Sequence, residues 1–423
     1  MNPFQQKPIS ILSTYESFSD LYPLPYDPKT VDPYTKCRII LMNGTEFEAV
    51  KFSHQMTRHV QDQNLRRELA MSRRTEQQQQ KKLANLKPLC ETILQHTIGY
   101  EQLAVDLTAH LAQRVCCPQV REALDFALLE DFDHLYRYAD LMENDTGEHA
   151  ENLVGRYTEI MPGRPTISEH RFPKDGIPEP LGKGAPLFDQ LAAMIITAAE
   201  QQTMNYYMNQ TGFYGNDLGR RLYQEIGMIE EQHVTQYEAL QNPNMTWLEC
   251  MLMHEYTECY LYWSCEQTET DPRIRAIWTR SLEQEIAHLH KAAQLLEQYE
   301  HRHWQQIIPN PEFPAPLRLE SNIPYVRRIL GTVQLTYKDR HPTPVQSLDA
   351  GDPFFGYQEI AHRDTDHTAS HQVIEQTIAQ SGQDYRFETA PHPVHPLRER
   401  QKDNTQIGRD PSVEGYTAPF TDS

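Results

Sequence analysis

The stretch EQQTMNYYMNQTGFYGNDLGRRLYQEIGMIEEQH, residues 200–233, begins with a glutamate, and an acid-x-x-His motif opens thirty positions later at Glu230. Glu230 and His233 are three positions apart, so on a helix both side chains lie on one face. The run Gly-Phe-Tyr-Gly-Asn-Asp at 212–217 lies midway and favours a turn. At about 1.5 Å per residue, a chain that turns there returns to the height of Glu200. The stretch therefore predicts a helical hairpin with two carboxylates and one imidazole at one level.

Two further stretches repeat this pattern with the same thirty-position spacing. They consist of Glu101, Asp131 and His134, and of Glu255, Glu285 and His288. Cys116-Cys117-Pro118 and Asp271-Pro272 mark their midpoint turns. Small or apolar residues surround each lone glutamate at helical spacing, which directs its carboxylate into a core. Because an unpaired buried carboxylate is costly, several on one apolar seam call for a cation.

A single acid-x-x-His motif is common by chance and is usually a solvated pair on a helix surface. Three copies at one spacing, each with its own upstream glutamate, are more specific and favour metal binding. Two such hairpins supply four carboxylates and two imidazoles, which is the ligand set of a dimetal-carboxylate four-helix bundle.

Composition restricts the partners of the chain. The 423 residues carry a formal net charge of −20, from 39 basic and 59 acidic residues, which argues against a nucleic-acid partner. The sequence has no run of eighteen apolar residues and no signal-peptide pattern, so we expect a cytoplasmic protein without a membrane partner. Seven scattered cysteines without a CxxC pair predict reduced thiols.

We expect an all-α fold in three parts. Residues 1–87 form an arm, in which residues 37–52 predict a small β-hairpin that turns at Asn43-Gly44, followed by a polar helix. Residues 88–305 form a helical domain of three hairpins, with helices expected over 88–114, 119–143, 187–210, 216–240, 245–267 and 272–305. Residues 306–423 lack sustained periodicity and predict an extended, partly disordered tail.

With two such hairpins joined by a long crossover, residues 88–240 resemble the ferritin-like superfamily, which includes ferritins, rubrerythrins and diiron oxygenases. The resemblance implies that two metal ions bind between Glu101, Asp131, His134, Glu200, Glu230 and His233. Iron is the implied metal, with manganese as the alternative, because carboxylate and imidazole ligands accept both. Asp131 stands where glutamate is usual, and Glu130 or Asp133 is the substitute ligand if the register differs. No CxxC pair follows, so a rubredoxin module is absent.

The resemblance leaves three functions open. The first is an oxidoreductase that activates O₂ or peroxide between the two ions, using an external electron donor that the sequence does not name. The second is iron handling, as a ferroxidase or storage protein, and the third is a non-catalytic structural or interaction module. We interpret Tyr207, seven positions after Glu200, as a core residue, with a redox or hydrogen-bonding role as the alternative.

The third hairpin, with Glu255, Glu285 and His288, is half of a second site, and Glu258 is one more candidate ligand. A link of about four residues reverses the chain before it, so the second and third hairpins point the same way and should not combine with each other. Three outcomes remain. The third hairpin pairs with the first, or is a decayed duplicate whose polar residues bond to each other, or meets its own copy across a homodimer two-fold axis.

Overall fold

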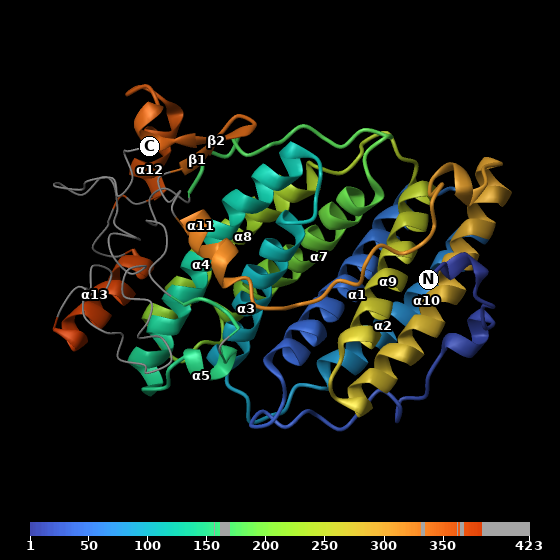
Figure 1. The fold of residues 1–423 in the computed structure, drawn as a ribbon, viewed down its shortest axis with the longest axis horizontal. Coiled ribbons are helices and arrows are strands. Elements are labelled where there is room, and N and C mark those ends of the chain that lie inside the picture. The colour runs from blue at the N-terminus through green and yellow to red at the C-terminus, as the bar shows by residue number, and fades with distance from the viewer. Residues whose placement is uncertain (156, 161–169, 331–334, 362, 364–367, 383–423) are drawn as a thin grey trace. The chain divides into compact units, whose positions relative to one another are not determined.

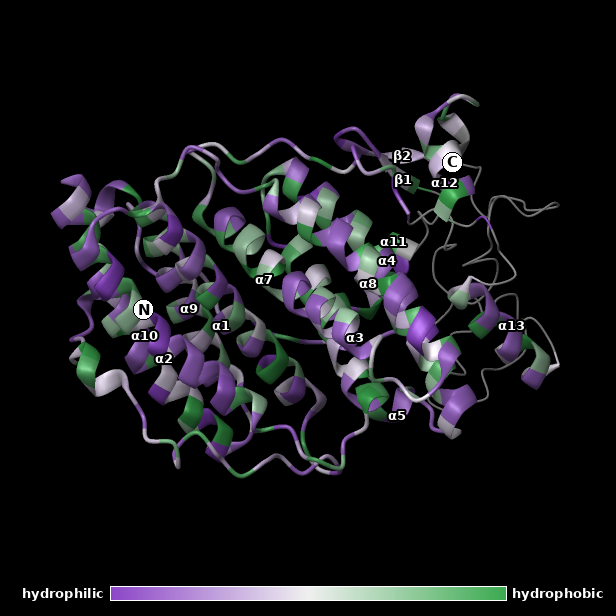
Figure 2. Ribbon diagram, turned by 180° about the vertical axis from the view of Figure 1, so that it is seen from behind, coloured by the Kyte–Doolittle hydropathy of each residue, from purple (hydrophilic) through white to green (hydrophobic). Residues whose placement is uncertain are grey.

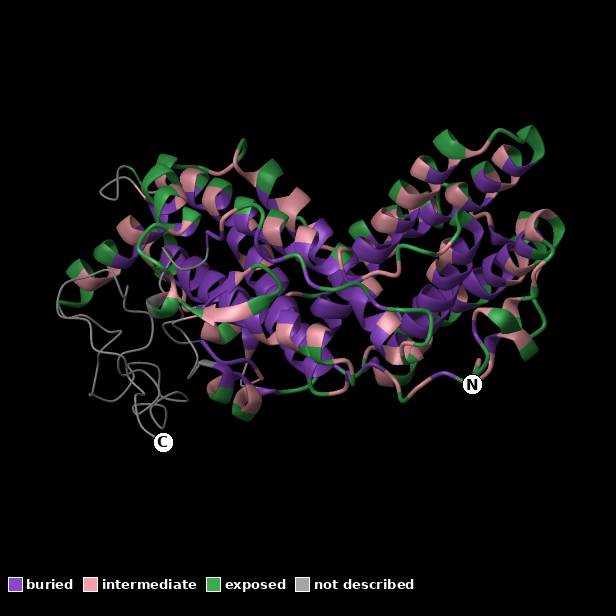
Figure 3. Ribbon diagram, turned by 90° about the horizontal axis from the view of Figure 1, so that it is seen from above, coloured by how far each residue is buried: buried purple, intermediate pink, exposed green. Residues whose placement is uncertain are grey.

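The computed structural model describes residues 1–155, 157–160, 170–330, 335–361, 363 and 368–382. Helices account for most of the regular structure, and the described residues contain a single sheet of two strands (Figure 1). The all-α prediction is therefore confirmed. Buried residues concentrate along the middles of the helices, whereas exposed residues gather at helix ends and connections (Figure 3).

The chain divides into two compact units. Unit 1 comprises Met1–Glu91, Pro180–Gln202 and Gln241–Leu319, and unit 2 comprises Thr92–Glu179, Thr203–Leu240 and Glu320–Ser423. Helix α7, Leu187–Gln210, contributes residues to both. Along the sequence, three segments of unit 1 thus alternate with three segments of unit 2. Residues of the expected arm and of the third hairpin belong to one of these units.

Unit 1 contains two helical hairpins. The first is α1 (Pro33–His59) with α2 (Gln63–Ala84), and the second is α9 (Trp247–Thr268) with α10 (Pro272–Glu300). Helix α1 lies antiparallel to α9, because Arg38 near the start of α1 pairs with Glu269 just after α9, while Phe52 near the end of α1 packs on Trp247. Helix α2 packs on α10, and most of its residues are hydrophilic (Figure 2).

Local signals fix where these helices begin. Asp32 and Asp271 accept hydrogen bonds from backbone N–H groups in the first turns of α1 and α10, and a proline occupies the first helical position of each. Thr246 forms a capping box with Glu249 at the start of α9. Such caps satisfy backbone donors that have no partner within the helix.

The predicted β-hairpin at residues 37–52 is wrong, since this segment lies within α1. Asn43 does not turn the chain; its side chain donates to the Gln80 carbonyl at 2.9 Å and accepts from Gln202 at 2.7 Å. A Cβ on Gly44 would lie 2.8 Å from the Cβ of Gln202. The Asn-Gly pair therefore serves close helix packing, which outweighs its preference for a turn.

Unit 2 is built on α3 (Ile93–Ala112), α4 (Pro118–Thr146), α8 (Asp217–Glu238) and the end of α7. A capping box of Thr92 and Gln95 opens α3, and Gly147 ends α4 in the left-handed conformation with φ of 70°. The short α5 (Glu151–Val154) follows, and α3 packs against both α4 and α5. The six helices expected over residues 88–305 all occur.

The C-terminal segment is more ordered than the predicted extended tail. It forms α11 (Ile323–Leu330), strands β1 (Leu335–Lys338) and β2 (His341–Pro344), α12 (Pro353–Ala361) and α13 (Ala369–Ser381). The strands pair antiparallel, with Leu335 opposite Pro344 and Lys338 opposite His341. Helix α13 packs on α4 and α8 of the same unit. Residues 383–423, for which disorder is predicted, lie outside the described part of the chain.

Gly44 provides a test of the α1 assignment. Replacing an ordinary helical glycine with alanine stabilises a protein by about 0.5–1 kcal/mol. We expect Gly44→Ala to lower the free energy of unfolding instead, because the new methyl group would overlap the Gln202 side chain. Gly356→Ala on α12, where the added carbon meets nothing within 4 Å, is the matched control and should not destabilise. Urea denaturation of both variants checks this, and a stabilised Gly44→Ala protein would contradict the packing described.

Candidate metal centres

Unit 2 brings together five of the six predicted ligands. Ligand atoms of Glu101, His134 and Glu230 lie within 4.8 Å of one another, and the same holds for Asp131, Glu230 and His233. Glu230 belongs to both groups, with one carboxylate oxygen 2.8 Å from His134 Nδ1 and the other 3.1 Å from His233 Nδ1. A carboxylate shared in this way stands where it would bridge two metal ions.

The sixth predicted ligand, Glu200, is buried on α7. It falls within Pro180–Gln202, a segment that belongs to unit 1. Its contribution to the centre of unit 2 stays a prediction.

The substitutes considered for Asp131 have other partners. His233 Nε2 lies 2.7 Å from a carboxylate oxygen of Glu130, which also pairs with Arg171 at 3.6 Å. Asp133 forms a buried ion pair with Arg137. Glu130 thus orients the imidazole of His233 from behind and leaves Nδ1 for the ligand cluster, which is the usual arrangement behind a metal-bound histidine.

Asp131 keeps its place among the ligand atoms despite its short side chain. Thr108 donates to its second oxygen at 3.0 Å, and its first oxygen lies 3.4 Å from His233 Nδ1. Burial raises the pKa of the Asp131 carboxyl to about 7, although His233 opposes the shift. Burial also favours a raised pKa for Glu230, but His134 and His233 outweigh it and lower that pKa below its usual range.

Tyr207 contacts the ligands directly. Its buried hydroxyl donates to a carboxylate oxygen of Glu101, which confirms the hydrogen-bonding alternative over plain packing. Burial and the nearby Glu101 raise the pKa of Tyr207 well above its usual value, so the phenol keeps its proton and remains a donor.

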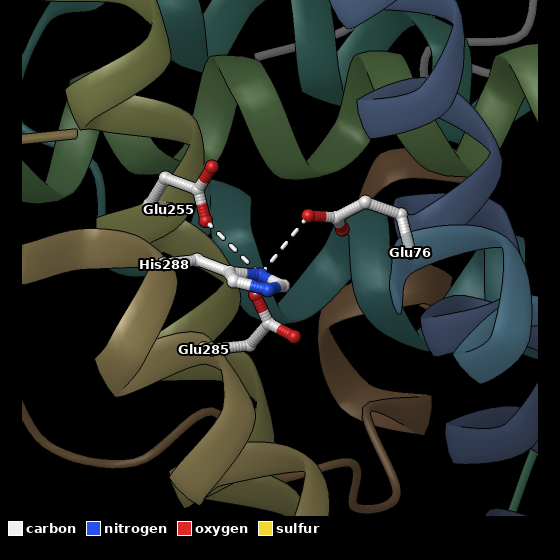
Figure 4. Close-up of side chains that lie close together, drawn as sticks. All are labelled: Glu76, Glu255, Glu285 and His288. Carbon is white, nitrogen blue, oxygen red and sulfur yellow. Dashed lines mark hydrogen bonds and ion pairs between the residues drawn. The ribbon is translucent and has the colours of Figure 1, made fainter. Parts of the chain in front are cut away.

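Unit 1 contains a second cluster, formed by the third hairpin and α2. Ligand atoms of Glu76, Glu255, Glu285 and His288 all lie within 4.8 Å of one another. Figure 4 shows the carboxylates of Glu76 and Glu255 directed at the His288 ring from two sides. His288 Nδ1 lies 3.1 Å from Glu76, 3.8 Å from Glu255 and 3.1 Å from Glu285.

A further group adjoins this cluster through Glu76. Ligand atoms of Glu46, Glu76 and Glu258 also lie within 4.8 Å of one another. Glu76 is therefore shared between two ligand groups, as Glu230 is in unit 2. Tyr262, seven positions after Glu255, donates its hydroxyl to Glu46, and this contact repeats the one between Tyr207 and Glu101.

Among the described residues, the five carboxylates of unit 1 share one charged partner, His288, whose pKa burial would lower but Glu285 and Glu76 raise well above its usual value. Both oxygens of Glu258 are buried without a hydrogen-bond partner, and so is one oxygen each of Glu46, Glu76 and Glu255. Among the described residues, no lysine or arginine pairs with any of the five glutamates. Burial, followed by repulsion between neighbouring carboxylates, raises the pKa of four of the carboxyls, those of Glu46, Glu255, Glu258 and Glu285. A cation would remove both penalties.

The sequence analysis missed the first hairpin of unit 1. Glu46 and Glu76 have the same thirty-position spacing as the other pairs, but the third position after Glu76 is Gln79 in place of histidine. The Asn-Gly pair at 43–44 also favoured a turn where α1 runs. A search for the spacing alone, without the histidine, would have found this copy.

The two centres differ at two positions, and one difference compensates for the other. Gln79 in unit 1 corresponds to His134 in unit 2, so unit 1 has one imidazole fewer. Its extra carboxylate, Glu258, stands three positions after Glu255, where the corresponding residue after Glu200 is Thr203. Unit 1 therefore replaces a nitrogen donor with an oxygen donor and keeps a full ligand set. Gln79 donates to Glu285 and so holds this ligand in place.

Comparison with known proteins identifies no relative of this chain, since no protein-family model, no curated protein and no solved structure matches it. Within the described residues, no helix combines the length and apolar character required to cross a membrane. The assignment of the two clusters as candidate metal centres therefore follows from the arrangement of their own residues.

Single ligand substitutions should remove metal from one centre at a time. We expect Glu230→Ala to lose the metal of unit 2 and Glu285→Ala that of unit 1, each roughly half of the total if both centres bind two ions. The exposed neighbours Glu231→Ala and Glu283→Ala are matched controls that should keep full occupancy. Elemental analysis of protein purified from metal-supplemented cells measures this, and full occupancy in Glu285→Ala protein would remove the unit 1 assignment.

Chelation should destabilise the folded protein. Metal at 100 times its dissociation constant contributes about 2.7 kcal/mol to stability. Since 1 kcal/mol shifts the melting temperature of a domain of 150–250 residues by roughly 2–4 °C, we expect a fall of about 5–10 °C. Scanning calorimetry with and without chelator tests this. A double variant, Glu230→Ala with Glu285→Ala, should no longer respond, and an undiminished response would show that the metal binds elsewhere.

Proposed function

We propose that the protein is a dimetal-carboxylate oxidoreductase with one metal pair in each unit. The observation that carries the proposal is the set of buried carboxylate oxygens of Glu46, Glu76, Glu255 and Glu258 that have no partner. Each centre also has one carboxylate common to two ligand groups, which is the geometry a metal pair requires. The ferritin-like resemblance of the sequence is consistent with this proposal.

The donor sets fit iron or manganese. Carboxylate oxygens and imidazole nitrogens are ligands that both metals accept, and metal–ligand bonds of about 2 Å are compatible with ligand atoms within 4.8 Å of one another. In unit 2, Glu101, Asp131, His134, Glu230 and His233 would hold the ions, with Glu200 as the predicted sixth ligand. A bound pair would supply electrons to O₂ or peroxide and so begin oxidation of a substrate.

The protein side chains prepare the site for this chemistry. Tyr207 and Tyr262 each fix one ligand carboxylate by donating a hydrogen bond to it, and Glu130 fixes the ring of His233. Ligand atoms held in this way need little reorganisation when the charge on the metals changes. The ligands are nearly inaccessible to bulk water, with exposures of 1% or less for Glu101, Asp131, His134, Glu230 and His233. Exclusion of water protects reactive species from side reactions.

A substrate-oxidising enzyme is favoured over iron storage by one structural feature. In unit 1, a cavity approaches the metal ligands and reaches Glu258. Storage would require only a path for ions, whereas this cavity has largely apolar walls.

Oxygen consumption by ferrous protein tests the proposed function. Protein loaded with Fe²⁺ without oxygen should consume O₂ when mixed with oxygenated buffer. Glu230→Ala should consume less, because unit 2 loses a ligand common to both metal positions, and Glu231→Ala should match the wild type. An oxygen electrode and ultraviolet–visible spectroscopy provide the measurement. Retention of iron without any O₂ consumption would contradict the oxidoreductase, and growth of iron cores of many ions per chain would favour storage instead.

A further inference from the structure

A cavity of about 90 Å³ lies in unit 1 between α1, α7 and α9. Its inner wall is buried and apolar, with Leu181, Ala193 and Met253 each 2% exposed or less. The half-exposed side chains of Asn242 and Met245 lie at its outer end. A single water requires about 10–15 Å³ of such space, so the cavity has room for a short chain of about five heavy atoms.

This cavity continues toward the metal ligands of the same unit. A smaller void of about 20 Å³ is lined by Glu258, Thr257 and Thr45. The two voids share four lining residues, Glu48, Met194, Gln241 and His254. The two voids are therefore neighbours, and the smaller one reaches Glu258, whose two oxygens are buried without a hydrogen-bond partner.

His254 lines both voids and provides a polar group between them. Burial lowers the pKa of His254 to about 4, so the imidazole is neutral, and we assign its proton to Nε2, which then donates a hydrogen bond to a Glu48 carboxylate oxygen at 2.5 Å. His254 Nδ1 is buried, has no partner and is thereby left as an acceptor. The Phe52 ring stacks on the imidazole at 4.3 Å and holds its plane.

We propose that this cavity is the substrate site of the unit 1 centre and binds a short, uncharged aliphatic molecule with one hydrogen-bond donor, such as an alcohol. The largely apolar walls disfavour charged ligands, because the one carboxyl group among the lining residues, that of Glu48, is already hydrogen-bonded to His254 and burial of an unpaired charge is costly. His254 Nδ1 accepts the hydrogen bond of the ligand hydroxyl and fixes its carbon chain in the cavity, near Glu258. This proposal gives a substrate class to the oxidoreductase function and rests on it.

Ligand-observed NMR with 1-butanol tests the cavity, with 1-chlorobutane as a probe of similar size that lacks the donor. The metal-free protein should bind both saturably. Met245→Trp should abolish binding by filling the cavity mouth, and Met245→Leu, which keeps the volume, should retain it. His254→Phe should weaken 1-butanol binding about fivefold and leave 1-chlorobutane binding unchanged, since one buried hydrogen bond contributes roughly 1 kcal/mol.

The proton relaxation of bound 1-butanol tests whether the cavity lies close to the metal ions. With Mn²⁺ bound, the proton relaxation of 1-butanol should increase strongly, whereas Zn²⁺ should have no such effect. No saturable binding, or equal binding to Met245→Trp, would overturn the cavity assignment. Binding without enhanced relaxation in protein shown to contain Mn²⁺ would overturn the substrate role. Absence of retained Mn²⁺ would refute the metal function itself, and the metal-free titration would still decide the cavity.

Discussion

Burial of several carboxylates in one apolar helix seam is the constraint on which this structure depends. Water stabilises an isolated carboxylate so strongly that its transfer to a protein interior requires a cation, a proton or several donors. In unit 2, two imidazoles and Thr108 meet part of this requirement. In unit 1, three glutamates surround one imidazole, two more adjoin them through Glu76, and neither oxygen of Glu258 has a hydrogen-bond partner. The second arrangement is the harder to explain without a metal.

The order of the hairpins along the chain explains how one sequence makes two such centres. The two outer hairpins combine in unit 1, and the α3–α4 hairpin packs within unit 2 with α8. Helices α1 and α9 are antiparallel, which is the relation that a two-fold ligand arrangement requires. Two hairpins joined by a short link run in the same direction, so they cannot face each other across a two-fold axis. Pairing the first hairpin with the last one gives the antiparallel relation that such a site requires. None of the three outcomes foreseen for the third hairpin describes this one, since its partner is the α1–α2 hairpin.

Much of the fold was predictable because helical periodicity is a local property. The thirty-position spacing located the hairpins, and the turns at 116–118, 212–217 and 271–272 agree with the helix ends. The failures arose where distant contacts decide. Asn43-Gly44 favours a turn in isolation, but packing against Gln202 makes it helical. In the α1–α2 hairpin, Gln79 stands at the position where the other hairpins have a histidine, so the acid-x-x-His motif does not identify this hairpin. The C-terminal helices α11 and α13 are short, and their contacts with α4, and for α13 also with α8, support them more than their own sequence does.

Anomalous X-ray scattering from crystals of protein purified with iron tests the central claim most directly. The account predicts two pairs of peaks, with the ions of each pair roughly 3.5–4 Å apart. One pair should lie beside Glu76, between His288 and Glu258, and the other beside Glu230, between His134 and His233. Crystals of iron-supplemented protein that show no anomalous peak at either position, with Glu258 neutralised by a protein side chain, would contradict it.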